Sequence, residues 1–159
     1  MKYVAGGAVK TEDCVFCRAI KQADGPENLI VWRGKYSFII LNLFPYTSGH
    51  AMVVPYEHID SIEDLASETR SEMMEFIAIL MRALRAVYSP QAFNIGANIG
   101  AAAGAGIAAH VHMHIVPRWS GDTNFMSTIG ETRVIPEAPA ETYRRIHRQI
   151  EKDLGKSAD

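Results

Sequence analysis

The residues with the clearest chemical potential are three histidines at alternate positions, His110, His112 and His114, separated by Val111 and Met113. Side chains on a β-strand alternate between two faces, so this spacing predicts that the three imidazoles share one face. On a helix the same spacing would scatter the rings. Each ring carries polar nitrogens that need partners when buried, which makes three such rings costly as plain core packing. The spacing therefore predicts a functional site on a strand.

Two chemistries fit this row of histidines. Histidines at alternate strand positions can hold a catalytic zinc ion together with a third ligand from elsewhere. Alternatively, one neutral imidazole attacks a phosphorus atom covalently, while its neighbours orient it and bind phosphate oxygens. The sequence around the row favours attack at phosphorus, and it offers no nearby carboxylate of the kind that serves as base in a zinc hydrolase.

The motif His-x-His-x-His followed by two apolar residues resembles the signature of the histidine triad (HIT) superfamily of nucleotide hydrolases and transferases. Residues 103–107 and 117–125 extend the similarity, which runs over residues 14–136. The longer pattern resembles the bacterial branch that includes diadenosine tetraphosphate phosphorylases. The resemblance implies an α+β HIT fold, adenine nucleotides or dinucleoside polyphosphates as substrates, and a homodimer or larger homo-oligomer.

The resemblance also implies roles for two of the histidines. His112 would attack the α-phosphate of a nucleoside polyphosphate, and His114 would donate to a phosphate oxygen and to the leaving group. The nucleotidyl-histidine would then pass to orthophosphate or to water. We expect a diadenosine tetraphosphate phosphorylase, with a dinucleoside polyphosphate hydrolase and a nucleoside phosphoramidase as alternatives within the family. A nucleotide-binding regulator without useful turnover is a further alternative.

Asn42 stands eight residues before His50, in the segment Asn-Leu-Phe-Pro-Tyr-Thr-Ser-Gly-His. An asparagine after a strand is ordinarily a turn former. Its place in this segment matches the HIT position that contacts the nucleotide ribose, so the resemblance implies a nucleotide-binding role for Asn42.

A glycine-rich loop over residues 100–106 precedes the triad. Such loops present main-chain N–H groups, which bind phosphate oxygens. Many HIT relatives carry amide or hydroxyl side chains here, which Ala105, Gly106 and Ile107 lack. We therefore expect phosphate contacts from main-chain N–H groups of the loop, including those of Gly104, Ala105 and Gly106, and from Asn98. Trp119, after the triad, is a further candidate to border the polyphosphate.

Cys14 and Cys17 are the only cysteines in the chain. A disulfide is disfavoured in a cytosolic protein, which leaves a metal site, buried thiols or redox work. A lone Cys-x-x-Cys is a weak signal, because zinc normally takes four ligands. Bacterial HIT proteins complete such a site with the glycine-linked histidine and the first triad histidine, so the resemblance implies a structural zinc held by Cys14, Cys17, His50 and His110.

The chain has 159 residues, of which 48% are hydrophobic, enough for one core. We divide it into an N-terminal arm (1–13), a HIT domain (14–136) and a C-terminal helical extension (137–159). A net charge of −2 gives no electrostatic case for a nucleic-acid or membrane partner. The first residues lack a signal-peptide pattern, so a cytoplasmic location is the default expectation.

Hydrophobic periodicity predicts an antiparallel sheet of about five strands, one long helix and a C-terminal helix. The expected strands cover residues 29–33, 36–41, 50–55, 93–99 and the triad segment 110–116. The expected helices cover residues 67–88 and 139–155. We interpret the charges of the second helix, among them Arg145, as a solvent-exposed face.

Overall fold

The computed structural model describes residues 11–122 and 137–155. The fold is α+β, with an antiparallel sheet in the strand order β1-β2-β3-β5-β4. The strands are β1 (Ile30–Arg33), β2 (Ser37–Leu41), β3 (Ala51–Pro55), β4 (Ala92–Gly96) and β5 (Met113–Arg118). The helices are α1 (Val15–Ala19), α2 (Ser67–Tyr88) and α4 (Pro139–Asp153), with single 3-10 turns η1 (Thr11–Asp13), η2 (Ile62–Asp64) and η3 (Ala101–Ala103). Residues 1–10 of the predicted arm and residues 123–136 of the predicted HIT domain lie outside the described residues.

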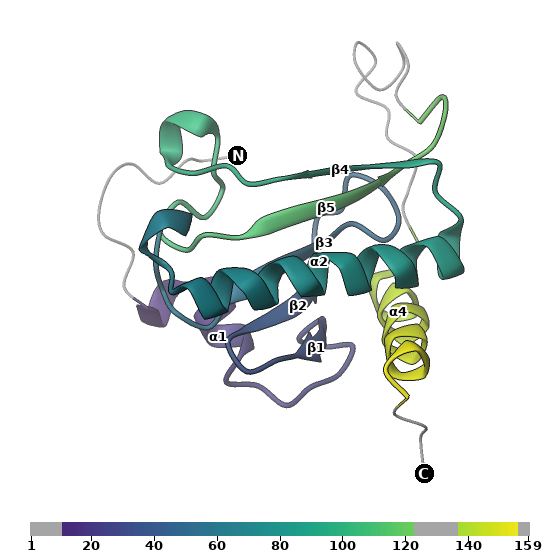
Figure 1. Cartoon of the computed structure of the whole chain (residues 1–159), viewed down its shortest axis with the longest axis horizontal. Coiled ribbons are helices and arrows are strands. Elements are labelled where there is room, and N and C mark those ends of the chain that lie inside the picture. Colours follow the sequence, from purple (N-terminus) through teal and green to yellow (C-terminus); the bar gives the residue numbers. More distant parts are fainter. Residues whose placement is uncertain (1–10, 123–136, 156–159) are drawn as a thin grey trace.

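The long helix α2 has the bounds that the periodicity predicts. It lies across the sheet (Figure 1) and contacts β2 and β3. The apolar stripe of α2 is buried against the sheet, and its large members are Met73, Phe76, Ile77, Leu80 and Leu84. Burying each such side chain contributes roughly 1.5–3 kcal/mol, so this stripe fixes the helix on the sheet.

The first three strands agree with their predicted positions to within one residue, whereas the other two differ more. The strand predicted over residues 93–99 ends at Gly96, so Asn98 lies beyond it. The triad strand starts only at Met113, because the Val111 N–H donates to the Ile59 carbonyl at 2.7 Å instead of joining the ladder. His110 and His112 therefore precede β5, and among the three histidines only His114 lies within it.

The register of the sheet determines what surrounds His114. Met52 of β3 and Gly96 of β4 are its direct partners on either side. Directly paired residues of antiparallel strands share a face, so both flank the His114 side chain. A side chain at Gly96 would meet nothing within 4 Å, which leaves open space on one side of the histidine.

The C-terminal helix α4 lies at the right-hand end of the molecule in Figure 1 and packs against α2 and β1. Its Tyr143, Ile146 and Ile150 are buried, as the amphipathic pattern predicts. Arg145 differs from the prediction, because it pairs with Glu137 at 2.8 Å and donates to the Val87 carbonyl. Within the described ranges, no helix is both long and apolar enough to span a membrane.

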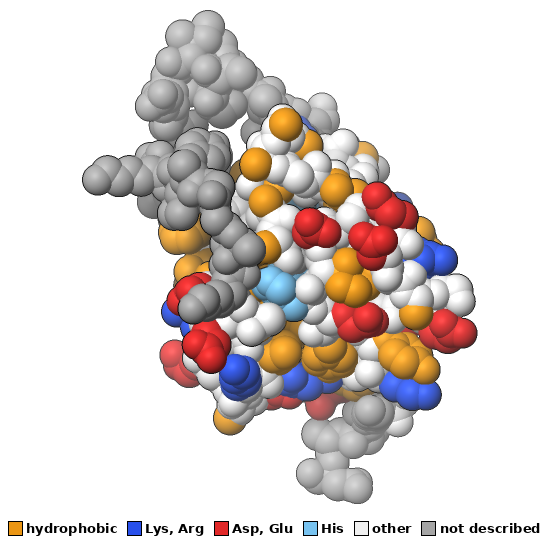
Figure 2. Space-filling view, turned by 90° about the vertical axis from the view of Figure 1, so that its left-hand side faces the viewer, with side chains coloured by type: hydrophobic (Ala, Val, Ile, Leu, Met, Phe, Trp, Pro, Cys, Tyr) orange, Lys and Arg blue, Asp and Glu red, His pale blue; other side chains and the backbone are white. Residues whose placement is uncertain are grey.

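The opposite end of the molecule carries the start of β5. Figure 2 views this end and shows histidine at the surface, surrounded by a mixture of hydrophobic and acidic side chains.

Candidate active site and metal group

The rings of His112 and His114 lie next to each other, with their centroids 4.8 Å apart and their planes at 72°. His112 is 5% exposed, and His114 is half-buried. The sheet positions His114 directly, whereas His112 is held by the extended segment just before β5. These two rings form the centre of the candidate active site.

A backbone carbonyl fixes the protonation of His112. Its Nδ1 lies 2.8 Å from the carbonyl oxygen of His110. A carbonyl only accepts hydrogen bonds, so Nδ1 carries the proton and Nε2 keeps its lone pair. Burial lowers the pKa of His112, outweighing the opposite effect of this hydrogen bond. His112 is therefore a neutral imidazole with a free Nε2, as a nucleophile requires.

His50 fixes the protonation of His114 through a short relay. The N–H of Tyr46 donates to Nδ1 of His50 at 3.2 Å, which leaves the proton of the neutral ring on Nε2. That Nε2 donates to Nδ1 of His114 at 2.9 Å. The remaining proton of His114 must then sit on its Nε2. Consequently, His114 carries an N–H donor on a ring adjacent to the His112 ring.

The environment keeps the relay rings neutral. Burial, with a contribution from the neighbouring histidines, lowers the pKa of His50 and of His114 to about 4. His50 itself is 1% exposed. Neutral rings have one donor and one acceptor each, so the chain from Tyr46 to His114 has a single direction.

Residues 42–50 form the loop that carries this relay. The Asn42 amide nitrogen lies 3.3 Å from Nδ1 of His50, and its Oδ1 accepts a hydrogen bond from the Phe44 N–H at 3.1 Å. The Tyr46 ring stacks on the His50 ring at 4.7 Å. Asn42 is thus placed within the site, next to the histidine relay.

Three bulky side chains of this loop are exposed: Leu43 (60%), Phe44 (71%) and Tyr46 (62%). Exposed apolar groups of this size gathered on one loop indicate a surface that contacts a ligand or a partner. The sequence reasoning did not identify them. Their signal was the concentration of large apolar residues between a strand end and Gly49, where loops are ordinarily polar.

The other candidate residues lie on three further segments. Asn98 is exposed between β4 and η3, and no described contact joins it to His112 or His114. Ala105 is buried within the glycine-rich loop, whose Gly100 and Gly104 have positive φ angles of 83° and 82°. Trp119 follows the end of β5, five residues from His114, roughly 17 Å of extended chain. Within one chain, Trp119 is therefore remote from His112.

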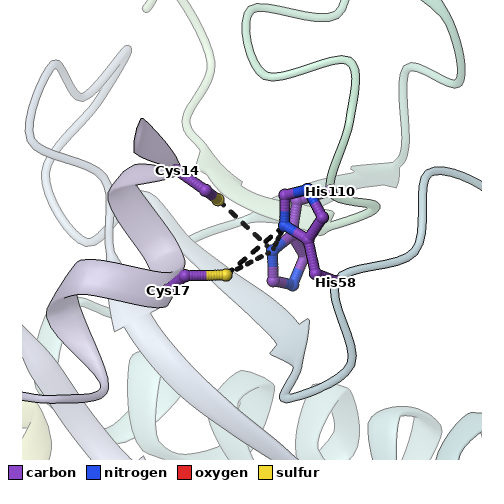
Figure 3. A group of neighbouring side chains, drawn as sticks. All are labelled: Cys14, Cys17, His58 and His110. Carbon is purple, nitrogen blue, oxygen red and sulfur yellow. Dashed lines mark hydrogen bonds between the residues drawn. The ribbon is translucent and has the colours of Figure 1, made fainter. Parts of the chain in front are cut away.

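Four potential metal ligands meet where α1 lies beside the sheet: Cys14, Cys17, His58 and His110. Figure 3 shows the two cysteines pointing from the start of α1 towards the two histidine rings. Nδ1 of His58 lies 3.3 Å from Nδ1 of His110 and 3.3 Å from Sγ of Cys17. Nδ1 of His110 lies 3.4 Å from Sγ of Cys14 and 3.7 Å from Sγ of Cys17.

These separations suit a tetrahedral zinc ion. With Zn–S bonds near ~2.3 Å and Zn–N bonds near ~2.0 Å, tetrahedral ligands lie roughly 3.3–3.8 Å apart. Nε2 of His110 donates to the Pro55 carbonyl at 2.9 Å, which leaves the Nδ1 lone pair facing the cysteines. Burial and the neighbouring Cys14 raise the pKa of Cys17 to about 11, so a thiolate here needs a compensating cation. The donor set therefore fits zinc.

The structure brings His58, and not the predicted His50, together with Cys14, Cys17 and His110. The two histidines flank opposite ends of β3, and β5 runs antiparallel to this strand. Met52 pairs with His114, so the start of β3 lies beside His114 and its end lies beside His110. Because of this register, His50 lies beside His114 in the relay, whereas His58 lies beside His110 in the metal group.

Phe16 of α1 joins the two groups. Its ring is 2% exposed and lies 5.3 Å from the His110 ring and 5.1 Å from the His112 ring. The residues that hold α1 against the sheet thereby also place an apolar wall beside His112.

Comparison with known proteins gives consistent similarities. The HIT domain model matches residues 25–121. The AP-4-A phosphorylase of Mycobacterium tuberculosis is 44% identical over 125 residues, which cover 79% of this chain and 64% of that relative, less than two thirds of its length. The protein hit of Bacillus subtilis is 28% identical over 92% of this chain and 97% of its own.

A solved structure extends the similarity to the fold. The crystal structure of a Zn-bound histidine triad family protein from Mycobacterium smegmatis aligns with a TM-score of 0.73 and 27% sequence identity. The alignment covers 92% of this chain and 99% of that chain.

Proposed function

The chain belongs to the HIT domain family, and from this premise we propose that it is a nucleotidyltransferase that cleaves diadenosine tetraphosphate through a nucleotidyl-His112 intermediate. The geometry of His112 carries the proposal. Its Nδ1–H is held by the His110 carbonyl, and its ring lies next to the His114 ring, with the centroids 4.8 Å apart. Two adjacent rings of this kind can supply a nucleophile and a hydrogen-bond donor to one phosphoryl group.

In the first step, Nε2 of His112 attacks the α-phosphorus of the dinucleotide. A P–N bond forms, and the bond between the α-phosphorus and the bridging oxygen breaks, so ATP leaves with the electron pair. The His112 ring becomes positively charged, and its Nδ1–H remains bonded to the His110 carbonyl, which stabilises that charge. The His114 N–H and the main-chain N–H groups of the glycine-rich loop bind the charge that develops on the phosphoryl oxygens.

In the second step, an oxygen of orthophosphate attacks the nucleotidyl-histidine. The P–N bond breaks, ADP forms, and Nε2 of His112 recovers its lone pair. Water in place of orthophosphate would give AMP instead. We favour orthophosphate as the acceptor because of the 44% identity to a relative named AP-4-A phosphorylase.

For the nucleoside, the loop of residues 42–50 offers suitable contacts. Asn42 supplies a polar side chain next to the relay, as a ribose contact requires. The exposed rings of Phe44 and Tyr46 and the Leu43 side chain offer apolar surface for the adenine base.

The metal group has a structural part in this proposal. Zinc bound by Cys14, Cys17, His58 and His110 would hold α1 against the sheet and keep the His110 ring in place. The group includes only the first triad histidine, which argues against a zinc hydrolase that uses the triad as ligands.

We also propose a homodimer. Strand β4 is at one edge of the sheet, most of its side chains are exposed, and Ile95 is 43% exposed. An open strand edge of this kind is a template for pairing with another strand, and a second copy of the chain would cover it.

Product analysis tests the proposed reaction. The protein is incubated with diadenosine tetraphosphate, with and without orthophosphate, and the nucleotides are separated. We expect ATP and ADP when phosphate is present. ATP and AMP under both conditions would establish a hydrolase instead, and an unchanged substrate would contradict the proposal.

A further inference from the structure

Glu137, immediately before α4, contacts three parts of the molecule at once. Its carboxylate accepts hydrogen bonds from the Tyr88 hydroxyl, from Oγ1 of Thr142 at 3.0 Å and from Arg145 at 2.8 Å. Its own N–H donates to Oγ of Ser48 at 3.1 Å. Because Ser48 belongs to the loop that ends at His50, Glu137 connects the C-terminal helix and the end of α2 to the histidine relay.

The ionisation states of these groups suit that connection. Burial and the bond to Glu137 raise the pKa of Tyr88 to about 12, so its hydroxyl remains a donor at neutral pH. Burial works to raise the pKa of Glu137, but the bonds from Tyr88, Arg145 and Thr142 outweigh it and keep the pKa below its usual range. The Glu137 side chain is thus a charged carboxylate that accepts all three hydrogen bonds.

Tyr88 also supports the backbone directly before His50. Gly49 has a φ of 82°, and a side chain there would lie 2.7 Å from the Leu84 side chain and 3.2 Å from the Tyr88 ring. The end of α2 therefore packs closely against Gly49. Asn42, His50 and Glu137 also line one small cavity between the loop and α4.

From these contacts we propose that Glu137, held by Tyr88 and Arg145, is a positioning residue for His50. The C-terminal helix thereby belongs to the catalytic apparatus, because His50 sets the proton position on His114. The inference rests on the proposed function for its catalytic consequence. Its structural part, the fixed orientation of the His50 ring, stands independently of any substrate.

A purely structural role for the same residues is the competing explanation. Arg145 donates to the Val87 carbonyl at 2.9 Å and lies over the Tyr88 ring at 4.6 Å, so the cluster also joins α4 to the end of α2. An experiment must therefore separate loss of helix docking from loss of His50 alignment.

Two variants and a matched control make this separation. Glu137→Gln removes the negative charge that pairs with Arg145. Ser48→Ala removes only the hydrogen bond between the loop and the Glu137 N–H. Glu141→Gln is the control, since Glu141 pairs with Arg144 at 2.9 Å on the exposed side of the same helix. The ring ¹⁵N signals of His50 and His114 are recorded without substrate, and kcat and KM are measured with diadenosine tetraphosphate.

We expect Glu137→Gln and Ser48→Ala to shift the ¹⁵N signals of both rings, to lower kcat by about three- to tenfold and to change KM by less than about twofold. Glu141→Gln should match the wild type in every measurement. Wild-type ring signals and kcat in both variants, with or without a lower melting temperature, would reduce Glu137 to a helix anchor and overturn the inference. If the wild type turns over no dinucleotide, the proposed function fails, while the ring signals still decide whether Glu137 positions His50.

Discussion

Four histidines around the start of β5 each have one ring nitrogen fixed by a neighbour, and this determines what the other nitrogen can do. Carbonyl oxygens fix the proton on Nε2 of His110 and on Nδ1 of His112. The lone pair of His110 Nδ1 therefore faces the cysteines, and that of His112 Nε2 is left for the candidate active site. A backbone N–H fixes His50, which in turn fixes His114. In the proposed function, metal binding, nucleophilic attack and hydrogen-bond donation therefore belong to different rings.

The buried relay makes a prediction about titration. Free histidine titrates near ~6.5, whereas burial lowers the pKa of His50 and His114 to about 4. Ring NMR signals of both residues should therefore show neutral imidazole down to about pH 5. Both pKa values are lower in the folded protein than in the unfolded chain, so the unfolded chain binds more protons between about pH 6.5 and pH 4. The free energy of unfolding should therefore decrease as the pH is lowered through this window. Midpoints near ~6.5 for His50 and His114 would contradict the relay.

Asn42 makes a second prediction at this scale. Asn42→Ala should weaken mononucleotide binding by about 1–2 kcal/mol, the cost of one lost hydrogen bond to a ligand in a closed site. Calorimetric titration with AMP measures this cost. Leu65→Val, in the core and away from the loop, is a control for general destabilisation. Wild-type affinity in Asn42→Ala would leave Asn42 as a turn residue only.

The sequence indicated which residues could do chemistry better than it indicated their neighbours. The alternation of His110, His112 and His114 predicted a site, and the Cys-x-x-Cys spacing indicated two of the four potential metal ligands that the structure brings together. The choice between His50 and His58 depended on the register of β3 against β5, which the hydrophobic pattern of either strand leaves open. The exposure of the Leu43 and Phe44 side chains was likewise not predictable, because it depends on the conformation of the loop.

Among the elements, α2 was the most predictable, because its buried residues recur at helical spacing from Thr69 to Leu84. The triad strand was predicted too long, since the alternation of side chains continues through His110 although the ladder starts at Met113. The polar contacts of α4 were not predictable from the sequence. The ion pair between Arg145 and Glu137 depends on how the helix packs against the rest of the molecule.

Helix α2 also anchors the turn between β1 and β2 through one carboxylate. Glu72 accepts hydrogen bonds from the N–H groups of Lys35, Tyr36 and Ser37 and from the Ser37 hydroxyl, at 2.7–2.9 Å. Glu72→Gln keeps the size of the side chain but replaces one acceptor oxygen with a donor. We expect the free energy of unfolding at pH 7 to fall by about 1–3 kcal/mol, as measured by urea denaturation.

The effect of Glu72 should depend on pH in a defined direction. Burial works to raise its pKa, but the hydrogen bonds from Tyr36, Ser37 and Lys35 outweigh it and lower the pKa. The stabilisation by Glu72 is complete above the pKa that its carboxyl group has in the unfolded chain. It is lost as the pH falls through the lower pKa of the same group in the folded protein. The difference between Glu72→Gln and the wild type should therefore shrink in acid. Glu75→Gln, exposed on the same helix, should have no such effect. Equal stability of Glu72→Gln and the wild type at pH 7 would contradict the anchor.

At the scale of the whole molecule, the metal group joins segments that are far apart in the sequence. Cys14 directly precedes α1 and Cys17 lies within it, whereas His58 comes from the loop after β3 and His110 from the segment before β5. Protein purified without added metal should contain about one zinc per chain by elemental analysis. His58→Ala should lose the metal and melt at a lower temperature, because the bound ion stabilises the folded state.

His50→Ala is the matched control for the metal group. It should keep its zinc, since His50 lies in the relay and not among the ligands. Retention of zinc in His58→Ala together with its loss in His50→Ala would restore the ligand set predicted from the sequence. A wild-type content below about 0.2 zinc per chain would exclude a resident zinc.

The central claim is that Nε2 of His112 forms a covalent bond to the α-phosphorus, and trapping that bond tests it most directly. The protein is mixed with diadenosine tetraphosphate without orthophosphate, quenched within the first turnover and digested for mass spectrometry. We predict an adenylyl group on His112 and on no other residue, and none in His112→Asn, which should also lose turnover. An adduct on a different residue, or a His112→Asn variant with a tenth or more of the wild-type rate, would contradict the account.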